Sequence, residues 1–295
     1  MDCWVGFDIG GTKCAVCTGV EEAGAPCVLK RHEIATPATQ AEAMERMCAM
    51  ALDMTEGCRV LGAGVSAGGP LDCESGTLLN PPNLPGWSGA SWTERITRAL
   101  GAPAFMENDA NACALAEWKF GAGRGARNVI FLTFGTGMGS GLVLDGRLYS
   151  GTNDMAGEVG HMAMRPFGPV GYGKAGSFEG FCSGGGIAQL ARTRAVERLQ
   201  MGGRTGYCPD AAALDGITAQ SVAEAAVAGD PDALEVYRTS GQLLGEGLSL
   251  LIDVLNPEVI VIGSIFARAH DLLWPAAQEV IRREALSHAR AVCRV

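Results

Sequence analysis

The chain alternates between short apolar runs and longer stretches of helical periodicity. Apolar or β-branched runs bounded by turn residues predict three strands near the N-terminus, at residues 3–9, 13–20 and 27–35. Four apolar side chains then recur at helical spacing within residues 40–56, namely Met44, Met47, Cys48 and Ala51. A further strand from residue 60 ends in small residues. This order of strands, a helix and another strand predicts an α/β layer.

The second half repeats the opening design. Residues 107–123 predict a loop that runs into a helix stopped by glycines. Residues 128–151 predict a strand, a turn bearing Gly135, Thr136, Gly137 and Gly139, and a second strand. Helical stretches follow near 185–200, 219–228 and 231–254, where Asn256-Pro257 ends the last one, and residues 258–263 predict a buried strand.

The stretch VGFDIGGTKCAV at residues 5–16 resembles two nucleotide-binding motifs but matches neither of them. Gly6 and Gly11 have the spacing of a phosphate-binding P-loop, but Thr12-Lys13 reverses the order of its last two residues. A dinucleotide fingerprint needs a helix after the glycines, whereas a second strand is predicted here. An ordinary hairpin and an anion-binding turn both remain open. The similar turn about 125 residues later favours phosphate binding by both.

Composition narrows the class of protein. At 295 residues and 47% hydrophobic content, two well-cored domains are expected. The 23 basic and 32 acidic residues give a net charge of −9 with no basic cluster, which argues against a nucleic-acid partner. Neither a secretion signal nor a membrane helix is predicted, and the eleven scattered cysteines are typical of a reduced, cytoplasmic protein. Cys14 and Cys17 would point to opposite faces of a strand, which argues against a metal pair.

Five motifs in order resemble those of the ROK family of sugar kinases and repressors, within the actin/hexokinase superfamily. They are DIGGTK at 8–13, ENDANA at 107–112, FGTGMGSG at 134–141, GEVGH at 157–161 and NPEVIVIG at 256–263. The resemblance implies a two-lobe, ribonuclease-H-like α/β fold with a nucleotide and sugar cleft between lobes. We expect an N-terminal lobe over 1–110 and a C-terminal lobe over 111–295.

The resemblance also implies roles for individual residues. Asp109 matches the catalytic base, although an aspartate there would also suit a helix N-cap. Five residues match sugar ligands: Asn83, Asn108, Glu158, His161 and Glu179. For Asn83 a plain turn cluster, and for His161 a structural histidine, are the alternatives.

Further residues match the nucleotide site. Those of the two phosphate turns are Asp8, Gly10, Gly11, Thr12, Lys13, Thr136, Gly137 and Gly139, and Gly263 marks the adenosine side. Asp8 would act through water bound to Mg²⁺, and Lys13 is either a phosphate contact or solvated surface.

The chain departs from the family pattern in two places. Val170, Tyr172 and Ser177 stand where most relatives have zinc-binding cysteines, so we expect no structural zinc, and a loop at 168–186 that is ordered by packing or by substrate. Only 29 residues follow Phe266, so the returning C-terminal helix of the family is expected to be short or absent.

The expected activity is transfer of the γ-phosphoryl group of Mg-ATP to O6 of a hexose or N-acetylhexosamine, in a cytoplasmic homodimer. The alternative is a non-catalytic sugar-binding or sugar-sensing protein without a DNA-binding domain. The residues leave the identity of the sugar open.

Overall fold

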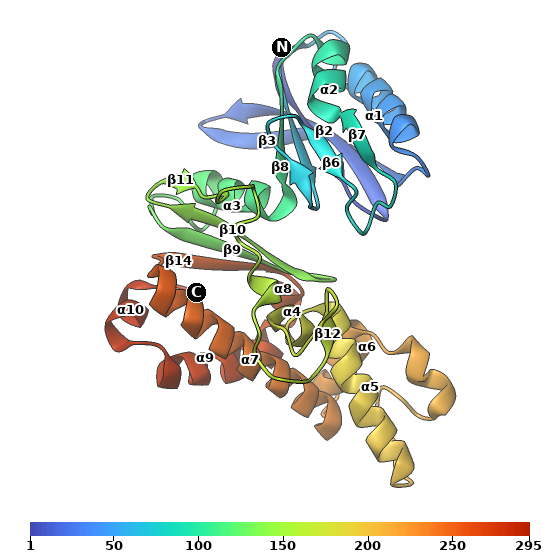
Figure 1. Ribbon diagram of the computed structural model, residues 1–295, viewed down its shortest axis with the longest axis vertical. Helices are drawn as coiled ribbons and strands as arrows, with labels where there is room; N and C mark the ends of the chain where they lie inside the picture. Colours follow the sequence, from blue (N-terminus) through green and yellow to red (C-terminus); the bar gives the residue numbers. More distant parts are fainter. The chain divides into compact units, whose positions relative to one another are not determined.

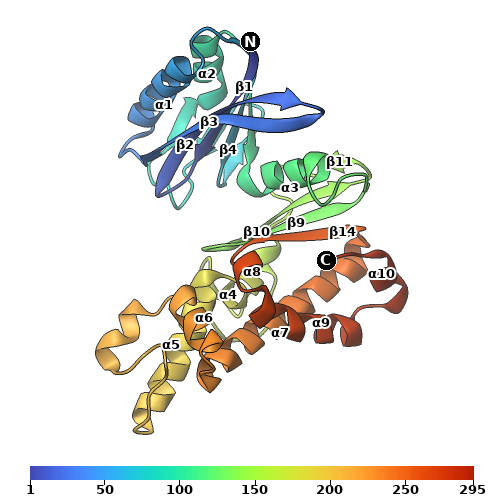
Figure 2. The ribbon, with the colours of Figure 1, turned by 180° about the vertical axis from the view of Figure 1, so that it is seen from behind.

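A computed structural model describes residues 1–295 and resolves them into two units. The first unit comprises Met1–Ala116 with Ser150–Ala156, and the second comprises Glu117–Tyr149 with Gly157–Val295. Each unit has its own sheet and its own helices, which Figure 1 and Figure 2 show from two sides. None of the helices has the length and apolarity needed to cross a bilayer.

The main sheet of the first unit has five strands in the order β3-β2-β1-β4-β8. Its strands are β1 (Asp2–Ile9), β2 (Lys13–Glu22), β3 (Ala25–Ala35), β4 (Arg59–Ala67) and β8 (Ala104–Asn108). A small second sheet is formed by β5 (Leu71–Asp72), β6 (Thr77–Leu79) and β7 (Ser88–Ser91). The helices are α1 (Gln40–Met54), α2 (Trp92–Leu100) and α3 (Asp109–Phe120), the last of which crosses the boundary of the units.

Alternation along β1 sorts its side chains between the two faces of the sheet. Phe7 and Ile9 are buried on one face, whereas Asp8 is exposed on the other. The buried residues join one core with Met47 of α1 and Ile96 of α2, the two helices that lie side by side in Figure 1. Because the two helices pack on the face of the sheet that carries Phe7 and Ile9, Asp8 lies outside this core.

The sheet of the second unit has four strands in the order β11-β10-β9-β14. Its strands are β9 (Val129–Phe134), β10 (Met138–Leu144), β11 (Arg147–Leu148) and β14 (Val259–Ser264), and a separate hairpin pairs β12 (Val170–Gly171) with β13 (Lys174–Ala175). The helices are η1 (Val159–His161), α4 (Phe178–Phe181), α5 (Gly184–Gln200), η2 (Ala211–Gly216), α6 (Ala219–Val227), α7 (Pro231–Leu255), α8 (Ile265–Arg268), α9 (His270–Glu284) and α10 (Ser287–Val292).

Helix α7 runs through the core of the second unit and packs closely along α9 (Figure 2). A Cβ atom on Gly241 would lie 2.5 Å from the Leu273 carbonyl oxygen, and one on Gly245 would lie 2.5 Å from that of Ala277. The glycines therefore let the two backbones approach. The predicted end of this helix is confirmed: Asn256 caps it in the left-handed conformation, with φ of 45°.

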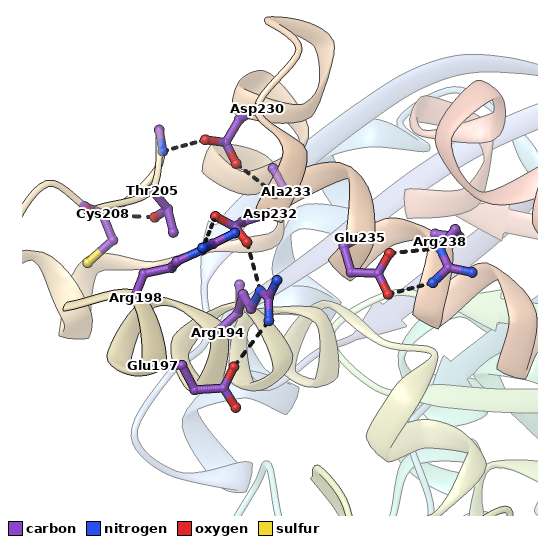
Figure 3. Close-up of polar contacts among 12 residues, drawn as sticks. Arg194, Glu197, Arg198, Thr205, Cys208, Asp230, Asp232, Ala233, Glu235 and Arg238 are labelled. Atoms are coloured by element: carbon purple, nitrogen blue, oxygen red, sulfur yellow. Dashed lines mark hydrogen bonds and ion pairs between the residues drawn. The ribbon is translucent and has the colours of Figure 1, made fainter. Parts of the chain in front are cut away.

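A buried carboxylate ties the start of α7 to α5. Asp232 accepts hydrogen bonds from Nε of Arg194 at 2.7 Å and from Nε of Arg198 at 2.8 Å (Figure 3). Its side chain is only 5% exposed. Burial by itself would raise the pKa of Asp232, but the hydrogen bonds and charges of the two arginines outweigh it and lower that pKa. The ionised carboxylate therefore holds the two helices together.

Replacing Asp232 with alanine is expected to destabilise the second unit. The change leaves two guanidinium groups without their shared acceptor. Because both arginines are over a third exposed, we expect a loss of about 2 kcal/mol, below the usual cost of breaking a fully buried pair. Thermal unfolding of Asp232→Ala measures this loss. Glu197→Ala is the matched control, since it removes only an exposed pair with Arg194; equal melting temperatures of the two variants would contradict the prediction.

Candidate functional site

The carboxyl ends of three parallel strands meet at one edge of the first sheet. The register of β1, β4 and β8 aligns Ile9 with Ala67, and Ala67 with Asn108. A Cβ atom on Gly68, just after β4, would lie 4.0 Å from a carboxylate oxygen of Asp109, just after β8. Such edges of parallel strands are where α/β proteins bind ligands. The small residues after β4 leave the Asp109 carboxylate accessible.

Asp8 lies at the same edge and interacts with Asp109 through charge. Although its side chain reaches solvent, partial burial raises the pKa of Asp8. The Arg31 guanidinium opposes this effect, while the carboxylates of Asp109 and Glu33 raise the pKa further. Two carboxylates that repel each other fit a divalent cation, since oxygen ligands of this kind suit Mg²⁺.

The turn between β1 and β2 is a tight hairpin with two unused amides. The Gly10 N–H donates to the Lys13 carbonyl oxygen at 3.0 Å, and the N–H groups of Gly11 and Thr12 have no acceptor. A Cβ atom on Gly11 would lie 2.7 Å from the Asn83 carbonyl oxygen, so glycine is needed for the Asn83 loop to pack here. The hairpin and the anion-binding interpretations are therefore compatible: the turn is a hairpin that presents two amides.

Lys13 has a protein partner. Its Nζ lies 2.6 Å from a carboxylate oxygen of Glu33, which also binds Arg31 at 3.0 Å. Hydrogen bonds from Lys13 and Arg31 lower the pKa of Glu33. An exposed pair of this kind contributes little energy, so it offers little resistance to exchange for a phosphate.

The strand β8 runs directly into helix α3, without the loop that the sequence predicted. Asn108 is the N-cap, because its Oδ1 accepts from the N–H groups of Ala110 at 2.9 Å and Asn111 at 3.4 Å. Asp109 occupies the first helical position and accepts only from Ala110, at 2.8 Å. The capping role considered for Asp109 thus belongs mainly to Asn108, and one Asp109 oxygen has no partner.

Glu107 supports this junction and was not anticipated. Its Oε1 accepts from Nδ2 of Asn111 and from the N–H of Asn108, both at 2.9 Å, and lies 3.6 Å from Sγ of Cys73. The only signal in the sequence is the spacing of four between Glu107 and Asn111, which suits a side-chain pair on a helix but does not single it out.

The second glycine turn joins β9 to β10. The Gly135 N–H donates to the Gly137 carbonyl oxygen at 3.0 Å, and the N–H groups of Thr136 and Gly137 have no acceptor. Gly139 does not lie in the turn, where the sequence placed it. It pairs with Thr133 inside β10 and donates its N–H to Oγ1 of Thr133 at 3.0 Å. The available amides of this turn are therefore those of Thr136 and Gly137.

The GEVGH segment and Glu179 pack against this turn. Oε2 of Glu179 accepts from the Met138 N–H at 2.9 Å, and a Cβ atom on Gly137 would lie 2.6 Å from the same oxygen. A Cβ atom on Gly160 would lie 2.2 Å from the Met138 carbonyl oxygen, which explains the second glycine of the motif. Glu158 is exposed, two residues before it. The second unit thus gathers Glu158 and Glu179 beside the glycine turn.

His161 ends the short helix η1, with its ring exposed. Its carbonyl oxygen accepts from Nζ of Lys174 at 2.6 Å, while no hydrogen bond holds the imidazole. The packing therefore gives no support to the alternative of a satisfied structural histidine. The ring is available to a ligand.

Backbone and side-chain packing order the loop where relatives are expected to bind zinc. The Gln189 side chain bonds both the N–H and the carbonyl oxygen of Val170, at 2.8 and 2.9 Å. Tyr172 forms the hairpin turn with φ of 44°. Ser177 is fully buried and caps α4 by accepting from the Gly180 N–H at 3.0 Å. No group of three or more histidine, cysteine or acidic side chains is arranged to hold a metal.

A pocket of about 830 Å³ opens beside the second glycine turn, within the second unit. It lies next to the end of β14, but Gly263 itself does not line it. The residues that line it come from five segments and include Gly135, Thr136, Gly184, Thr218, Tyr237, Ser264, Ile265 and Arg268. This volume suits a nucleotide-sized ligand. Gly263, the residue predicted for the adenosine side, therefore lies one residue before the pocket wall.

Known proteins share this arrangement over nearly the whole chain. Glucokinase from Streptomyces coelicolor is 32% identical over 291 residues, which is 96% of this chain and 88% of that protein. The crystal structure of a ROK family glucokinase from Streptomyces griseus, in complex with glucose and AMPPNP, has a TM-score of 0.76 at 31% identity and covers 97% of this chain and 90% of its own. A ROK family transcriptional regulator, a homologue of the Escherichia coli Mlc protein, has a TM-score of 0.82 at 26% identity, covering 99% of this chain and 73% of its own.

The fold and the two glycine turns place the protein in the actin/hexokinase class of α/β proteins. The model of the ROK family matches residues 4–295, and the chain belongs to that family.

Proposed function

We propose that Asp109 is the general base with which this ATP-dependent sugar kinase phosphorylates a hexose or N-acetylhexosamine at O6. The observation that carries the proposal is the state of the Asp109 carboxylate. It is exposed at the carboxyl ends of three parallel strands, it is spared from capping by Asn108, and it is close enough to Asp8 to affect its pKa. A carboxylate in this state can accept the proton of a sugar hydroxyl as the hydroxyl attacks.

The sugar would be oriented by the polar side chains that match the sugar ligands of the family. The Asn108 side chain caps α3 with its oxygen only, so its amide nitrogen is free to donate, and it faces Gly69 at the end of β4. Asn83, Glu158, His161 and Glu179 supply further donors and acceptors. Each buried sugar hydroxyl needs such a partner, since an unpaired one costs affinity.

Each unit presents amides that lack acceptors and that would suit phosphate oxygens of ATP, namely Gly11 and Thr12 in the first unit and Thr136 and Gly137 in the second. The AMPPNP bound by the Streptomyces griseus glucokinase supports ATP as donor. Asp8 would hold Mg²⁺ through water, and the bound cation would supply charge neutralisation at the transferred group. Phosphoryl transfer depends mainly on such positioning, and it needs no covalent enzyme intermediate.

The alternative function is sugar sensing without catalysis. The likeness to a ROK family transcriptional regulator, with a TM-score of 0.82, is the observation in its favour. A sensor would bind sugar through the same residues without needing Asp109 as a base.

The deciding experiment is ADP release from Mg-ATP against hexoses, N-acetylhexosamines and β-glucosides, with Asp109→Asn as the inactive control. We expect turnover on one class of sugar, with the phosphate on O6 by NMR of the product. If thermal shift detects sugar binding but no sugar causes release of ADP, the protein is a sugar sensor and not a kinase.

A further inference from the structure

Ser264 ends β14 in a backbone conformation that suits glycine. Its φ is 63° and its ψ is −117°. For residues other than glycine, this backbone conformation costs roughly 1–3 kcal/mol. It pairs in register with Phe134, the residue that precedes the second glycine turn. The strained residue therefore lies beside the turn that presents unused amides.

The Ser264 hydroxyl faces that turn without a partner of its own. A Cβ atom on Gly135 would lie 3.6 Å from Oγ of Ser264, and Oγ makes no hydrogen bond within the protein. Ile265, the next residue, packs over the start of α5, since a Cβ atom on Gly184 would lie 2.9 Å from its Cδ1. This packing and the start of α8 hold the strained turn in place.

Arg268 brings an uncompensated positive charge to the same pocket. It lines the pocket together with Ser264, its side chain is exposed, and it takes part in no ion pair or hydrogen bond. The other charged residue of the pocket is Glu224, whose carboxylate accepts from the Gln220 amide at 2.9 Å. The N–H groups of Gly184 and Gly185 at the start of α5 are already donated to carbonyl oxygens of the turn. Arg268 is thus the charge left for an anion.

We infer that Ser264 and Arg268 bind the phosphate chain of the donor nucleotide, the hydroxyl by donating to a phosphate oxygen and the guanidinium by a charge-assisted contact. The inference rests on the proposed function and adds two specificity-determining residues to its nucleotide site. An unpartnered hydroxyl beside unpartnered amides, with a lone cation on the same wall, suits a polyanion better than it suits adenine or ribose.

The test is calorimetric binding of adenosine and of ADP, in the presence of Mg²⁺, to the full chain and its variants. Ser264→Ala is expected to weaken the binding of ADP about 3- to 10-fold and to change the affinity for adenosine by less than about twofold. Ser264→Gly should weaken ADP equally while raising the melting temperature, because it also removes the strain. Arg268→Gln is expected to weaken the binding of ADP about 10-fold, with the strongest effect at low salt. Arg204→Gln removes the same charge from an exposed arginine outside the pocket and should change neither ligand.

Two results would overturn the inference. One is ADP affinity unchanged in Ser264→Ala and Arg268→Gln, and the other is an equal loss for adenosine and ADP, which would mean a change of pocket shape. If the wild-type protein still turns over a sugar, only the inference fails in these cases. If the variants behave as expected but no sugar is phosphorylated, the proposed function fails and the inference stands. A wild-type protein that binds neither adenosine nor ADP overturns both.

Discussion

Asp109→Asn is expected to lower kcat by about 10²- to 10⁴-fold while leaving sugar affinity and melting temperature close to those of the wild-type protein. The amide cannot take a proton from the attacking hydroxyl. Its oxygen can still accept from the Ala110 N–H, the one hydrogen bond that the Asp109 side chain makes. Steady-state kinetics of ADP release, together with sugar binding by calorimetry, measure the two effects separately.

A matched control keeps this result specific. Asp53→Asn makes the same chemical change at an exposed position of α1 whose side chain forms no hydrogen bond, and it should retain full activity. Near-normal turnover by Asp109→Asn would remove Asp109 from the role of base. A large drop in its melting temperature would assign it a structural role instead.

Asp8→Asn is expected to reduce kcat/KM for Mg-ATP by at least about 10-fold and, at the same time, to raise the melting temperature at pH 7. The loss of activity follows from the loss of a carboxylate that binds the cation. The gain in stability follows from the raised pKa of Asp8, which partial burial and the repulsion by Asp109 and Glu33 cause, against the effect of Arg31. Keeping that carboxylate ionised costs folding energy.

The dependence on pH gives this second prediction its sign. A folded-state pKa above the unfolded one means that the folded chain binds the proton more tightly. The ionised Asp8 therefore costs stability above its folded pKa, and this cost fades as the pH falls toward the unfolded value. The gain from Asp8→Asn should be full at neutral pH and should vanish in acid. A lower melting temperature for Asp8→Asn at pH 7, without added Mg²⁺, would contradict the electrostatic account.

Short-range patterns in the sequence predicted most of the secondary structure. The alternation over residues 3–9 became β1, the helical spacing of Met44, Met47 and Ala51 became α1, and Asn256 ended α7. These signals work because hydrogen bonding and amphipathicity within an element depend on residues a few positions apart.

The junctions between elements were predicted less well. Asn108, and not Asp109, caps α3, and Gly139 lies in a strand, because a one-residue shift of a helix start or of a strand pairing changes which backbone groups need partners. Propensity alone cannot resolve such a shift, since asparagine and aspartate cap helices about equally well.

By itself, the sequence determined the order of elements, the two glycine turns and, through its five motifs, the family. Only the tertiary structure decided which of the named residues act together. Asp8 and Asp109 lie a hundred residues apart and interact because β1 and β8 both pair with β4. Ser264 and Arg268 share a pocket with Gly135 because β14 pairs with β9. Such neighbours depend on strand pairing and core packing over the whole unit, and no local pattern records them.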